Sequence, residues 1–270
     1  MALQTTDVTP LIGTELKIDK ATLLSGEQSD AIRELLRQRG VVFVRDANIS
    51  EEEQLVVSHH LGKVQEQGNE GLQNISLDPE VSISADYLRG SFYWHIDGAS
   101  DDTPNFAATL NPKKLIEPAA ATYFANTYAA YDALSPEMKE KIDGLKVVHK
   151  LEMIQRLVYP DPTPEQLEDW KSYPQKIHPL VWTHTSGRKS LVMGATMSHV
   201  EGWDEEEGRK FLYDLQDEIT RPQFVYRHEW TPGDVIIWDN TGTVHRVMPY
   251  DIASGRLMHR ITLIGEERIQ

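Results

Sequence analysis

His95 and Asp97 form a short pattern that can bind a metal ion. They stand in the segment Trp94-His-Ile-Asp97, and alternate residues of an extended chain point to the same side. An imidazole nitrogen and a carboxylate oxygen can therefore reach one ion from this segment. Two imidazoles and one carboxylate on one face, with the opposite face open, are typical of a non-haem Fe(II) centre. The pattern predicts such a centre and requires a second histidine from elsewhere.

Taken alone, the His-x-acid pattern is weakly specific. Ten histidines and 42 acidic residues among 270 give about 1.6 matches by chance. The chain has two, and the second is His199-Val-Glu201. His95 ends the strand-like run Phe92–His95, so we expect it at the rim of a sheet, whereas His199 precedes a predicted helix. This context favours His95 with Asp97 and leaves His199 with Glu201 as the alternative pair.

His245 is the candidate for the third ligand. It follows a segment, residues 230–240, in which Pro232-Gly-Asp234 predicts a turn and Val235–Trp238 a buried strand. A distant strand of this kind can close a barrel and bring its flanking residue to the site. A lone histidine is nevertheless more often a surface residue than a ligand, so the pattern alone leaves both interpretations open.

Arg256 and Arg260 follow His245 in a strand-like segment. Residues 256, 258 and 260 of a strand face one way, and a guanidinium group binds a carboxylate through two parallel hydrogen bonds. In a chain of net charge −15, two such arginines beside a metal would capture small carboxylates. Two surface salt bridges are the alternative interpretation.

The composition restricts the classes of partner and site. A net charge of −15 repels phosphate groups, so we expect no nucleic acid and no membrane as partner. The absence of cysteine excludes disulfides, thiolate zinc sites and cysteine nucleophiles. The N-terminal residues lack a secretory signal, and no stretch nears the roughly 20 apolar residues of a membrane span. The expected location is cytoplasmic.

The elements that must position these residues are short strands with helices around them. The spacing predicts helices over Ser25–Arg39, from Ser50 to Gly62 with a capping box, from Ser135, and over Trp203–Ile219. Further strands are predicted at Gly40–Arg45, Phe106–Leu110, Leu191–Met193, Phe224–Trp230, Asp234–Trp238 and Leu257–Ile264. Without repeats or linkers, residues 1–270 are expected to form a single domain that is mainly β with peripheral helices.

Several ordered stretches resemble the family of taurine dioxygenase and 2,4-dichlorophenoxyacetate dioxygenase, the TauD/TfdA family. They cover nearly the whole chain and are Trp94–Asp97, Thr122–Leu134, His178–Trp182, Ser198–Gly202, Gly233–Asn240, His245 and Gly255–Arg260. Ser198–Gly202 and Phe224–His228 look closer to the phenoxyacetate branch. The taurine-contacting residues of the family have no clear counterparts over Gln65–Tyr87, which speaks against taurine as the substrate.

The resemblance implies a double-stranded β-helix, or jelly roll, and an Fe(II)- and 2-oxoglutarate-dependent dioxygenase that uses O₂ and releases succinate and CO₂. It implies that His95, Asp97 and His245 bind the iron. It further implies that Arg256 and Thr122 bind 2-oxoglutarate and that Arg260 binds the anionic group of the substrate. The expected reaction is hydroxylation of a small organic anion, aryloxyalkanoate-like or another carboxylate.

Two alternative functions stay open. One is cleavage of an alkylsulfonate or sulfate by the same family chemistry. The other is a cupin-type metal enzyme that uses His199, Glu201 and His245 without 2-oxoglutarate. The sequence also leaves open the identity of the substrate, whether hydroxylation leads to bond cleavage, and whether the chain forms a homo-oligomer.

Overall fold

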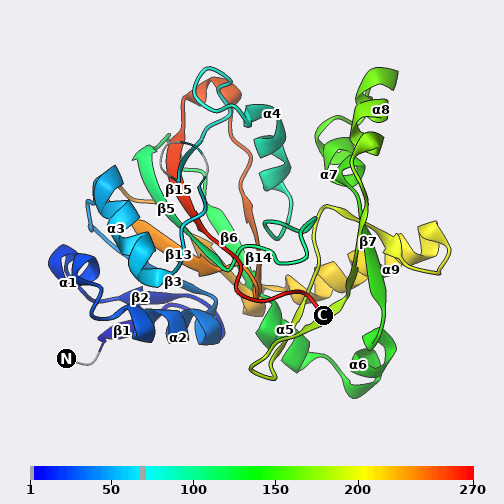
Figure 1. The fold of residues 1–270 in the computed structure, drawn as a ribbon, viewed down its shortest axis with the longest axis horizontal. Helices are drawn as coiled ribbons and strands as arrows, with labels where there is room; N and C mark the ends of the chain where they lie inside the picture. Colours follow the sequence, from blue (N-terminus) through cyan, green and yellow to red (C-terminus); the bar gives the residue numbers. More distant parts are fainter. Residues whose placement is uncertain (1–2, 67, 69–70) are drawn as a thin grey trace.

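A large sheet runs through the computed structural model, which describes residues 3–66, 68 and 71–270 (Figure 1). Within these residues the sheet has seven strands. In spatial order they are β1 (Thr5–Asp7), β2 (Thr14–Leu16), β3 (Val41–Val44), β13 (Val235–Asp239), β5 (Ala107–Lys114), β15 (Leu257–Leu263) and β4 (Leu72–Ile75). Neighbours are antiparallel, except that β2 and β3 are parallel. Strand β15 therefore has a neighbouring strand on each side. Arg256 directly precedes this strand, and Arg260 lies within it.

A three-stranded sheet packs against the large one. It consists of β12 (Val225–His228), β6 (Thr122–Asn126) and β14 (Thr243–Val247), with β6 in the centre. The rings of Phe124 on β6 and Trp238 on β13 have centroids 5.7 Å apart. Tyr226 on β12 stacks on Phe43 of β3 at 5.6 Å. Burial of these aromatic rings helps to hold the two sheets face to face.

Three N-terminal helices cover the outer face of the large sheet. They are α1 (Lys20–Ser25), α2 (Ser29–Arg39) and α3 (Glu51–Leu61). Leu36 of α2 and Val57 of α3 belong to the same buried cluster as Val42 of β3. These helices shield one face of the sheet and leave its other face for the site.

Two of these helices test the predicted boundaries. The capping box of Ser50 and Glu53 at the start of α3 is confirmed. The single helix predicted over Ser25–Arg39 is wrong at its beginning, because Gly26 adopts a left-handed φ of 72° and ends α1 there. Helix α2 begins only at Ser29.

A group of helices and short strands is inserted between β6 and β12, and its helices α6 to α9 lie on the right in Figure 1. The inserted elements are α5 (Thr127–Ala133), α6 (Pro136–Ile142), β7 (Lys146–His149), α7 (Leu151–Val158), α8 (Pro164–Ser172), β8 (Lys176–Pro179), β9 (Val181–Thr183), β10 (Lys189–Leu191), β11 (Met197–Val200) and α9 (Glu205–Ile219). Helix α9 packs on β11, where a Cβ at Gly208 would lie 2.8 Å from the Val200 nitrogen. The predicted helices from Ser135 and over Trp203–Ile219 are confirmed as α6 and α9, although α9 begins at Glu205.

The strand predicted at Phe92–His95 is wrong. A short helix α4 (Ala85–Leu88) and a 3-10 turn η1 (Arg89–Phe92) occupy this region. The Ser91 hydroxyl donates a 2.5 Å hydrogen bond to the Leu88 carbonyl and closes the turn. The aromatic residues that suggested a strand instead serve packing, since Phe92 meets the Tyr250 ring edge-on at 5.7 Å.

The other predicted strands are confirmed, with ends shifted by a few residues. They correspond to β3, β5, β12, β13 and β15. The run predicted at Leu191–Met193 is extended only at its first residue, where β10 ends. Two further 3-10 turns, η2 (Pro222–Phe224) and η3 (Ile252–Ser254), precede β12 and β15.

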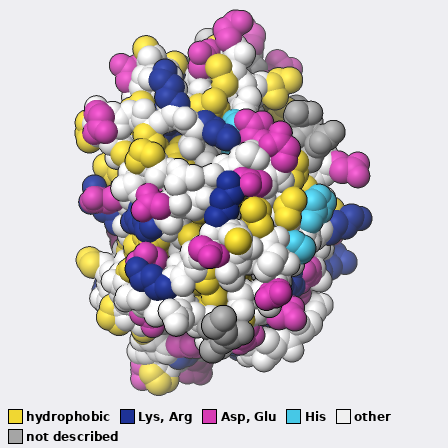
Figure 2. Space-filling view, turned by 90° about the vertical axis from the view of Figure 1, so that its left-hand side faces the viewer, with side chains coloured by type: hydrophobic (Ala, Val, Ile, Leu, Met, Phe, Trp, Pro, Cys, Tyr) yellow, Lys and Arg dark blue, Asp and Glu magenta, His cyan; other side chains and the backbone are white. Residues whose placement is uncertain are grey.

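The surface carries charges of both signs. On the face shown in Figure 2, Asp and Glu side chains lie among Lys and Arg side chains. None of the helices in the described part of the chain has the length and apolar character needed to cross a membrane. A cytoplasmic location stays a prediction from the sequence.

Candidate active site

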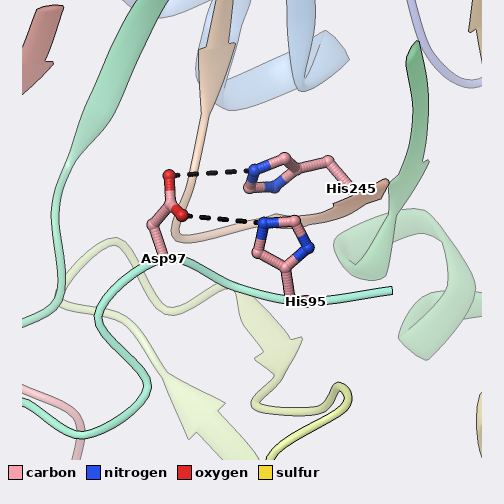
Figure 3. A group of neighbouring side chains, drawn as sticks. All are labelled: His95, Asp97 and His245. Carbon is pink, nitrogen blue, oxygen red and sulfur yellow. Dashed lines mark ion pairs between the residues drawn. The ribbon is translucent and has the colours of Figure 1, made fainter. Parts of the chain in front are cut away.

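His95, Asp97 and His245 lie side by side, with their polar atoms directed toward one another (Figure 3). Nε2 of His95 lies 3.7 Å from one carboxylate oxygen of Asp97, and Nε2 of His245 lies 3.7 Å from the other. The three candidate ligand atoms are all within 4.8 Å of one another. Within residues 3–66, 68 and 71–270, this is the one group of three or more His, Asp or Glu with such spacing.

A backbone bridge joins residues that are far apart in the sequence. The amide of His95 donates to the carbonyl of His245 at 3.0 Å, and the amide of His245 donates to the carbonyl of His95 at 2.9 Å. His245 itself is held in β14, where it pairs with Phe124 of β6. The two imidazole rings therefore lie 4.1 Å apart between centroids. His95 thus reaches the sheet rim through one bridge and not through a strand.

Both histidines are suited to donate a lone pair. Nδ1 of His95 lies 2.9 Å from the carbonyl of Tyr93, and a carbonyl can only accept, so the neutral ring would carry its proton on this nitrogen and present a bare Nε2. Burial, followed by the neighbouring His95, lowers the pKa of His245 to about 3. The ring is therefore neutral at physiological pH.

Asp97 is held as a carboxylate. Burial raises its pKa, but the charge of Arg260, followed by His245 and His95, outweighs this and brings the pKa of Asp97 to about 2. Two imidazoles and one carboxylate match the ligand set of a non-haem Fe(II) centre. The residues present therefore fit a ferrous ion.

Asn240 anchors the backbone of Asp97. Its side-chain oxygen accepts from the Asp97 amide at 2.9 Å, and its side-chain nitrogen donates to the Asp97 carbonyl at 2.9 Å. The same nitrogen donates to the carbonyl of Asn105 at 2.9 Å. Asn240 is fully buried and directly follows β13. Its hydrogen bonds therefore tie the Asp97 loop to the large sheet.

Gly194 allows the close approach of the His95 backbone. A Cβ at this position would lie 2.8 Å from the His95 Cα and 2.9 Å from the Trp94 carbonyl oxygen. The neighbouring Ala195 amide donates to that carbonyl at 2.8 Å. The segment between β10 and β11 thus contacts and supports the ligand segment.

A cavity adjoins His95 and His245 and is lined by both apolar and cationic side chains. Ile75, Leu88, Leu110 and Phe124 contribute to its apolar wall, and Thr122, Arg256 and Arg260 line it as well. The prediction that Arg256 and Arg260 face the same way is therefore confirmed. A small molecule with an apolar body and an anionic end is the kind of ligand that such a wall suits.

Arg256 is a buried cation that lacks a carboxylate partner among the described residues. It is 3% exposed, its Nε has no hydrogen-bond partner, and its guanidinium carbon lies 4.9 Å from the centroid of the Tyr250 ring. Burial lowers the pKa of Arg256. A buried charge is costly unless it is paired, so the site is prepared for an incoming anion.

Arg260 makes contacts that the sequence did not predict. Its Nη1 lies 3.2 Å from Asp97 Oδ2. Its Nε and Nη2 donate to the side-chain oxygen of Gln73, at 3.1 and 2.8 Å. Gln73 is the direct cross-strand neighbour of Arg260. The guanidinium group is therefore fixed between a candidate metal ligand and the edge strand.

The second His-x-acid pair lies elsewhere. His199 is on β11, where its Nδ1 is 3.0 Å from the Ser198 hydroxyl and 3.9 Å from Glu205. Glu201 follows the strand and pairs with Lys146 at 3.9 Å. Neither belongs to the cluster that contains His245. The alternative site of His199, Glu201 and His245 is therefore not formed.

Three residues that act on the site through others, Asn240, Gly194 and Gln73, were not predicted from the sequence. Asn240 stood in a recognised stretch without an assigned role, and an amide at the end of a buried strand was the available signal. Gly194 and Gln73 gave no pattern, because their contacts depend on chain segments distant in sequence.

Comparison with known proteins agrees with this geometry. Residues 4–262 match the model of the taurine catabolism dioxygenase TauD, TfdA family. The chain is 30% identical to an alpha-ketoglutarate-dependent 2,4-dichlorophenoxyacetate dioxygenase of Cupriavidus pinatubonensis, over 92% of this chain and 93% of that protein. It is 26% identical to an (S)-phenoxypropionate/alpha-ketoglutarate-dioxygenase of Sphingobium herbicidovorans, over 82% of this chain and 80% of that protein.

A solved structure supports the same assignment. The crystal structure of AAD-2 in complex with Mn(II) and N-oxalylglycine superimposes with a TM-score of 0.84 at 28% identity and covers 100% of both chains. A match over nearly the full length, in sequence and in structure, shows the family. The chain belongs to the TauD, TfdA family and is an Fe(II)- and 2-oxoglutarate-dependent dioxygenase.

Proposed function

We propose that this dioxygenase hydroxylates a small organic anion of the aryloxyalkanoate type, or a similar carboxylate. The observation that carries the proposal is the pairing of an apolar wall with three arginines, Arg246, Arg256 and Arg260, in one cavity beside the His–Asp–His group. The relatives named for 2,4-dichlorophenoxyacetate and (S)-phenoxypropionate make an aromatic ether acid the first substrate class to test.

In this proposal His95, Asp97 and His245 hold Fe(II). The bound ion, with 2-oxoglutarate and O₂, supplies the oxidising chemistry, and succinate and CO₂ are the coproducts. The protein supplies the neutral imidazoles, the ionised Asp97 and the surrounding burial. Its further task is to orient both organic anions before reaction.

Arg256 and Thr122 would bind 2-oxoglutarate. Arg256, whose Nε has no hydrogen-bond partner among the described residues, and Thr122 both line the cavity, and both side chains can donate to one carboxylate. A charge-assisted hydrogen bond is roughly twice as strong as a neutral one. The carboxylate remote from the oxo group would then be fixed while the oxo-acid end faces His95 and His245.

Arg260 would orient the substrate. Gln73 and Asp97 fix its guanidinium group, so its remaining N–H groups have a defined direction toward a substrate anion. The apolar residues Ile75, Leu88 and Leu110 would accept the ring. Fixing the two ends of the substrate presents one C–H bond to the metal site.

We further propose that the two facing sheets form a double-stranded β-helix and that residues 1–270 act as one catalytic domain. The support is the aromatic core shared by the sheets and the position of the His–Asp–His group where β14 meets the loop after η1. In this arrangement the inserted elements between β6 and β12 add to the site without forming a separate catalytic unit.

A substrate panel tests the proposal. Purified enzyme with Fe(II), 2-oxoglutarate and O₂ would be given 2,4-dichlorophenoxyacetate, (S)-2-phenoxypropionate, an alkyl sulfate or taurine, and succinate would be measured together with the organic product. We expect an aryloxy acid to raise succinate release at least tenfold above the substrate-free rate, with equimolar organic product. Stimulation by the alkyl sulfate or taurine alone would contradict the proposed substrate class.

A further inference from the structure

Trp230 makes a hydrogen bond to Thr122 inside the core. Its indole Nε1 donates to the Thr122 hydroxyl oxygen at 3.0 Å, and the two side chains are 4% and 5% exposed. Thr122 begins β6 and is the register partner of His228 on β12, so Trp230 lies two residues beyond the paired position. We propose that Trp230 is a positioning residue that directs the Thr122 hydroxyl hydrogen toward the carboxylate of 2-oxoglutarate.

The donor properties of the two groups give the hydrogen bond its direction. An indole N–H can only donate, whereas a hydroxyl donates one hydrogen and accepts through two lone pairs. The Thr122 oxygen is therefore the acceptor, and its own hydrogen stays available. Among the described residues the Thr122 hydroxyl has no acceptor for that hydrogen. Thr122, which carries this hydroxyl hydrogen, lines the cavity together with Arg256.

A buried network holds the Trp230 ring in place. The His228 ring meets Trp230 edge to face, with centroids 4.5 Å apart and an interplanar angle of 77°. Nε2 of His228 lies 3.1 Å from the Asp234 carboxylate, which can only accept, and Nδ1 lies 2.8 Å from the Tyr226 hydroxyl. Both His228 and Asp234 are fully buried. The position and the direction of the Trp230 indole N–H are therefore both fixed.

The inference rests on the proposed function, because it assumes that Thr122 binds 2-oxoglutarate. Without Trp230, the Thr122 hydroxyl could rotate, and its hydrogen would be shared among several directions. Hydrogen bonds in a chain polarise one another, so a hydroxyl that already accepts from an N–H donates more strongly. Trp230 would therefore strengthen cosubstrate binding without touching the cosubstrate.

Calorimetric titration of 2-oxoglutarate into the Mn(II)-loaded enzyme tests this without turnover. We expect Trp230→Phe to raise the dissociation constant about 3- to 10-fold, the size of one modest hydrogen bond. Trp182→Phe is the matched control, because Trp182 is also a buried indole but its Nε1 has no hydrogen-bond partner in the described part of the chain. It should leave the dissociation constant within twofold of the wild type, and the Mn(II) affinity should be unchanged in both variants.

A double variant separates positioning from packing. In a Thr122→Val background, Trp230→Phe should have no further effect on 2-oxoglutarate affinity, because the hydroxyl to be directed is absent. Thr122→Ser, which keeps the hydroxyl, should stay close to the wild type. An equal loss from Trp230→Phe with and without the Thr122 hydroxyl would overturn the inference, as would an unchanged affinity in Trp230→Phe.

Failure of the proposed function gives a different result. If Thr122→Val itself leaves 2-oxoglutarate affinity unchanged, the assignment of Thr122 fails and the role of Trp230 fails with it.

A second measurement uses no Trp230 variant, so it does not depend on how well such a variant folds. In the Zn(II)-loaded wild type labelled at indole nitrogen, the Trp230 N–H resonance should move downfield when 2-oxoglutarate binds, and Thr122→Val should abolish this shift. A resonance that does not respond to 2-oxoglutarate would contradict the proposal.

Discussion

The two histidines of the site are oriented by different means. His95 is held by the carbonyl of Tyr93, two residues before it in the chain. Among the described residues, Nδ1 of His245 has no hydrogen-bond partner, and the ring is held by other rings, with Phe124 at 6.0 Å and Trp238 at 5.1 Å between centroids. The orientation of His95 is thus a local property, whereas that of His245 depends on packing between the two sheets.

The role of Arg256 can be tested at the level of the single residue. Arg256→Ala should raise the apparent KM for 2-oxoglutarate about 10- to 100-fold, because hydrogen bonds to charged groups contribute roughly 1.5–3 kcal/mol. Arg256→Lys should recover only part of the loss, since an ammonium group lacks the planar fork. Steady-state titration of 2-oxoglutarate at saturating substrate would measure both effects.

Arg260 provides the comparison for that experiment. Arg260→Ala should raise the KM of the organic substrate more than that of 2-oxoglutarate, and because Arg260 also contacts Asp97 it should weaken Fe(II) binding. Arg256 makes no contact with the three candidate ligands, so Arg256→Ala should leave Fe(II) affinity unchanged. A 2-oxoglutarate KM that does not respond to Arg256→Ala would refute the assignment of that residue.

At the scale of elements, the turn that follows β13 has a direct task in the site. It carries Asn240, which clasps the backbone of Asp97 through two reciprocal hydrogen bonds. These two hydrogen bonds hold the backbone of Asp97 in the way that a neighbouring strand would hold it. The sequence signalled the strand and the turn but not the partner, because that partner lies about 140 residues away in the chain.

Asn240→Ala should loosen the Asp97 loop. Loss of a residue that supports a metal ligand typically costs 10- to 100-fold in metal affinity, and we expect the Fe(II) dissociation constant to rise by that factor under anaerobic conditions. Asn111→Ala is the control, because Asn111 is a buried asparagine on β5 that donates to the Ile49 carbonyl. It should destabilise the fold without changing metal affinity. Equal metal affinities in the two variants would contradict the role of Asn240.

Features set by residues close together in the sequence were mostly predicted, whereas contacts between distant segments were not. The strands β13 and β15 and the capping box of α3 were predicted because each has a local pattern. The strand predicted before His95 was wrong because local aromatic content outweighed the turn that Ser91 closes. His245 was predicted as a ligand beside His95, but its backbone bridge to His95 and the contact of Arg260 with Gln73 could not be predicted from local pattern, since both join segments distant in sequence.

At the scale of the whole molecule, the site lies where separate parts of the fold meet. The large sheet supplies Arg260, and Arg256 directly precedes its strand β15. The small sheet supplies His245, and the inserted elements support the backbone of His95 through Gly194. Two buried histidines lie on paired strands of the inserted elements, His149 on β7 and His178 on β8. His149 and His178 have ring centroids 5.8 Å apart, and burial lowers the pKa of each.

These histidines predict a stability that depends on pH. Burial lowers the pKa of His149 to about 3, below the value of about 6.5 in an unfolded chain. Between these two values the unfolded state binds more protons, so the free energy of unfolding falls as the pH falls below about 6.5, by at most about 1.4 kcal/mol per pH unit for each such histidine. Urea unfolding of the metal-free protein at pH 7.5 and 5.5 would measure the decline.

His149→Gln should reduce that decline by the share of one histidine. Glutamine can keep a hydrogen bond to Thr196, which lies 2.8 Å from Nδ1 of His149, and it does not titrate. His59→Gln, at an exposed position on α3, should leave the decline as in the wild type. A pH dependence that is the same in His149→Gln as in the wild type would show that this residue does not contribute.

The central claim is that His95, Asp97 and His245 hold the iron to which 2-oxoglutarate binds. Anaerobic titration of Fe(II) into the protein with 2-oxoglutarate, followed by the metal-to-oxo-acid charge-transfer band, tests it most directly. The wild type should reach an endpoint at one Fe(II) per chain, His95→Ala, Asp97→Ala and His245→Ala should lose the band, and His199→Ala should keep it. A full band in His245→Ala, or its loss in His199→Ala, would contradict the account.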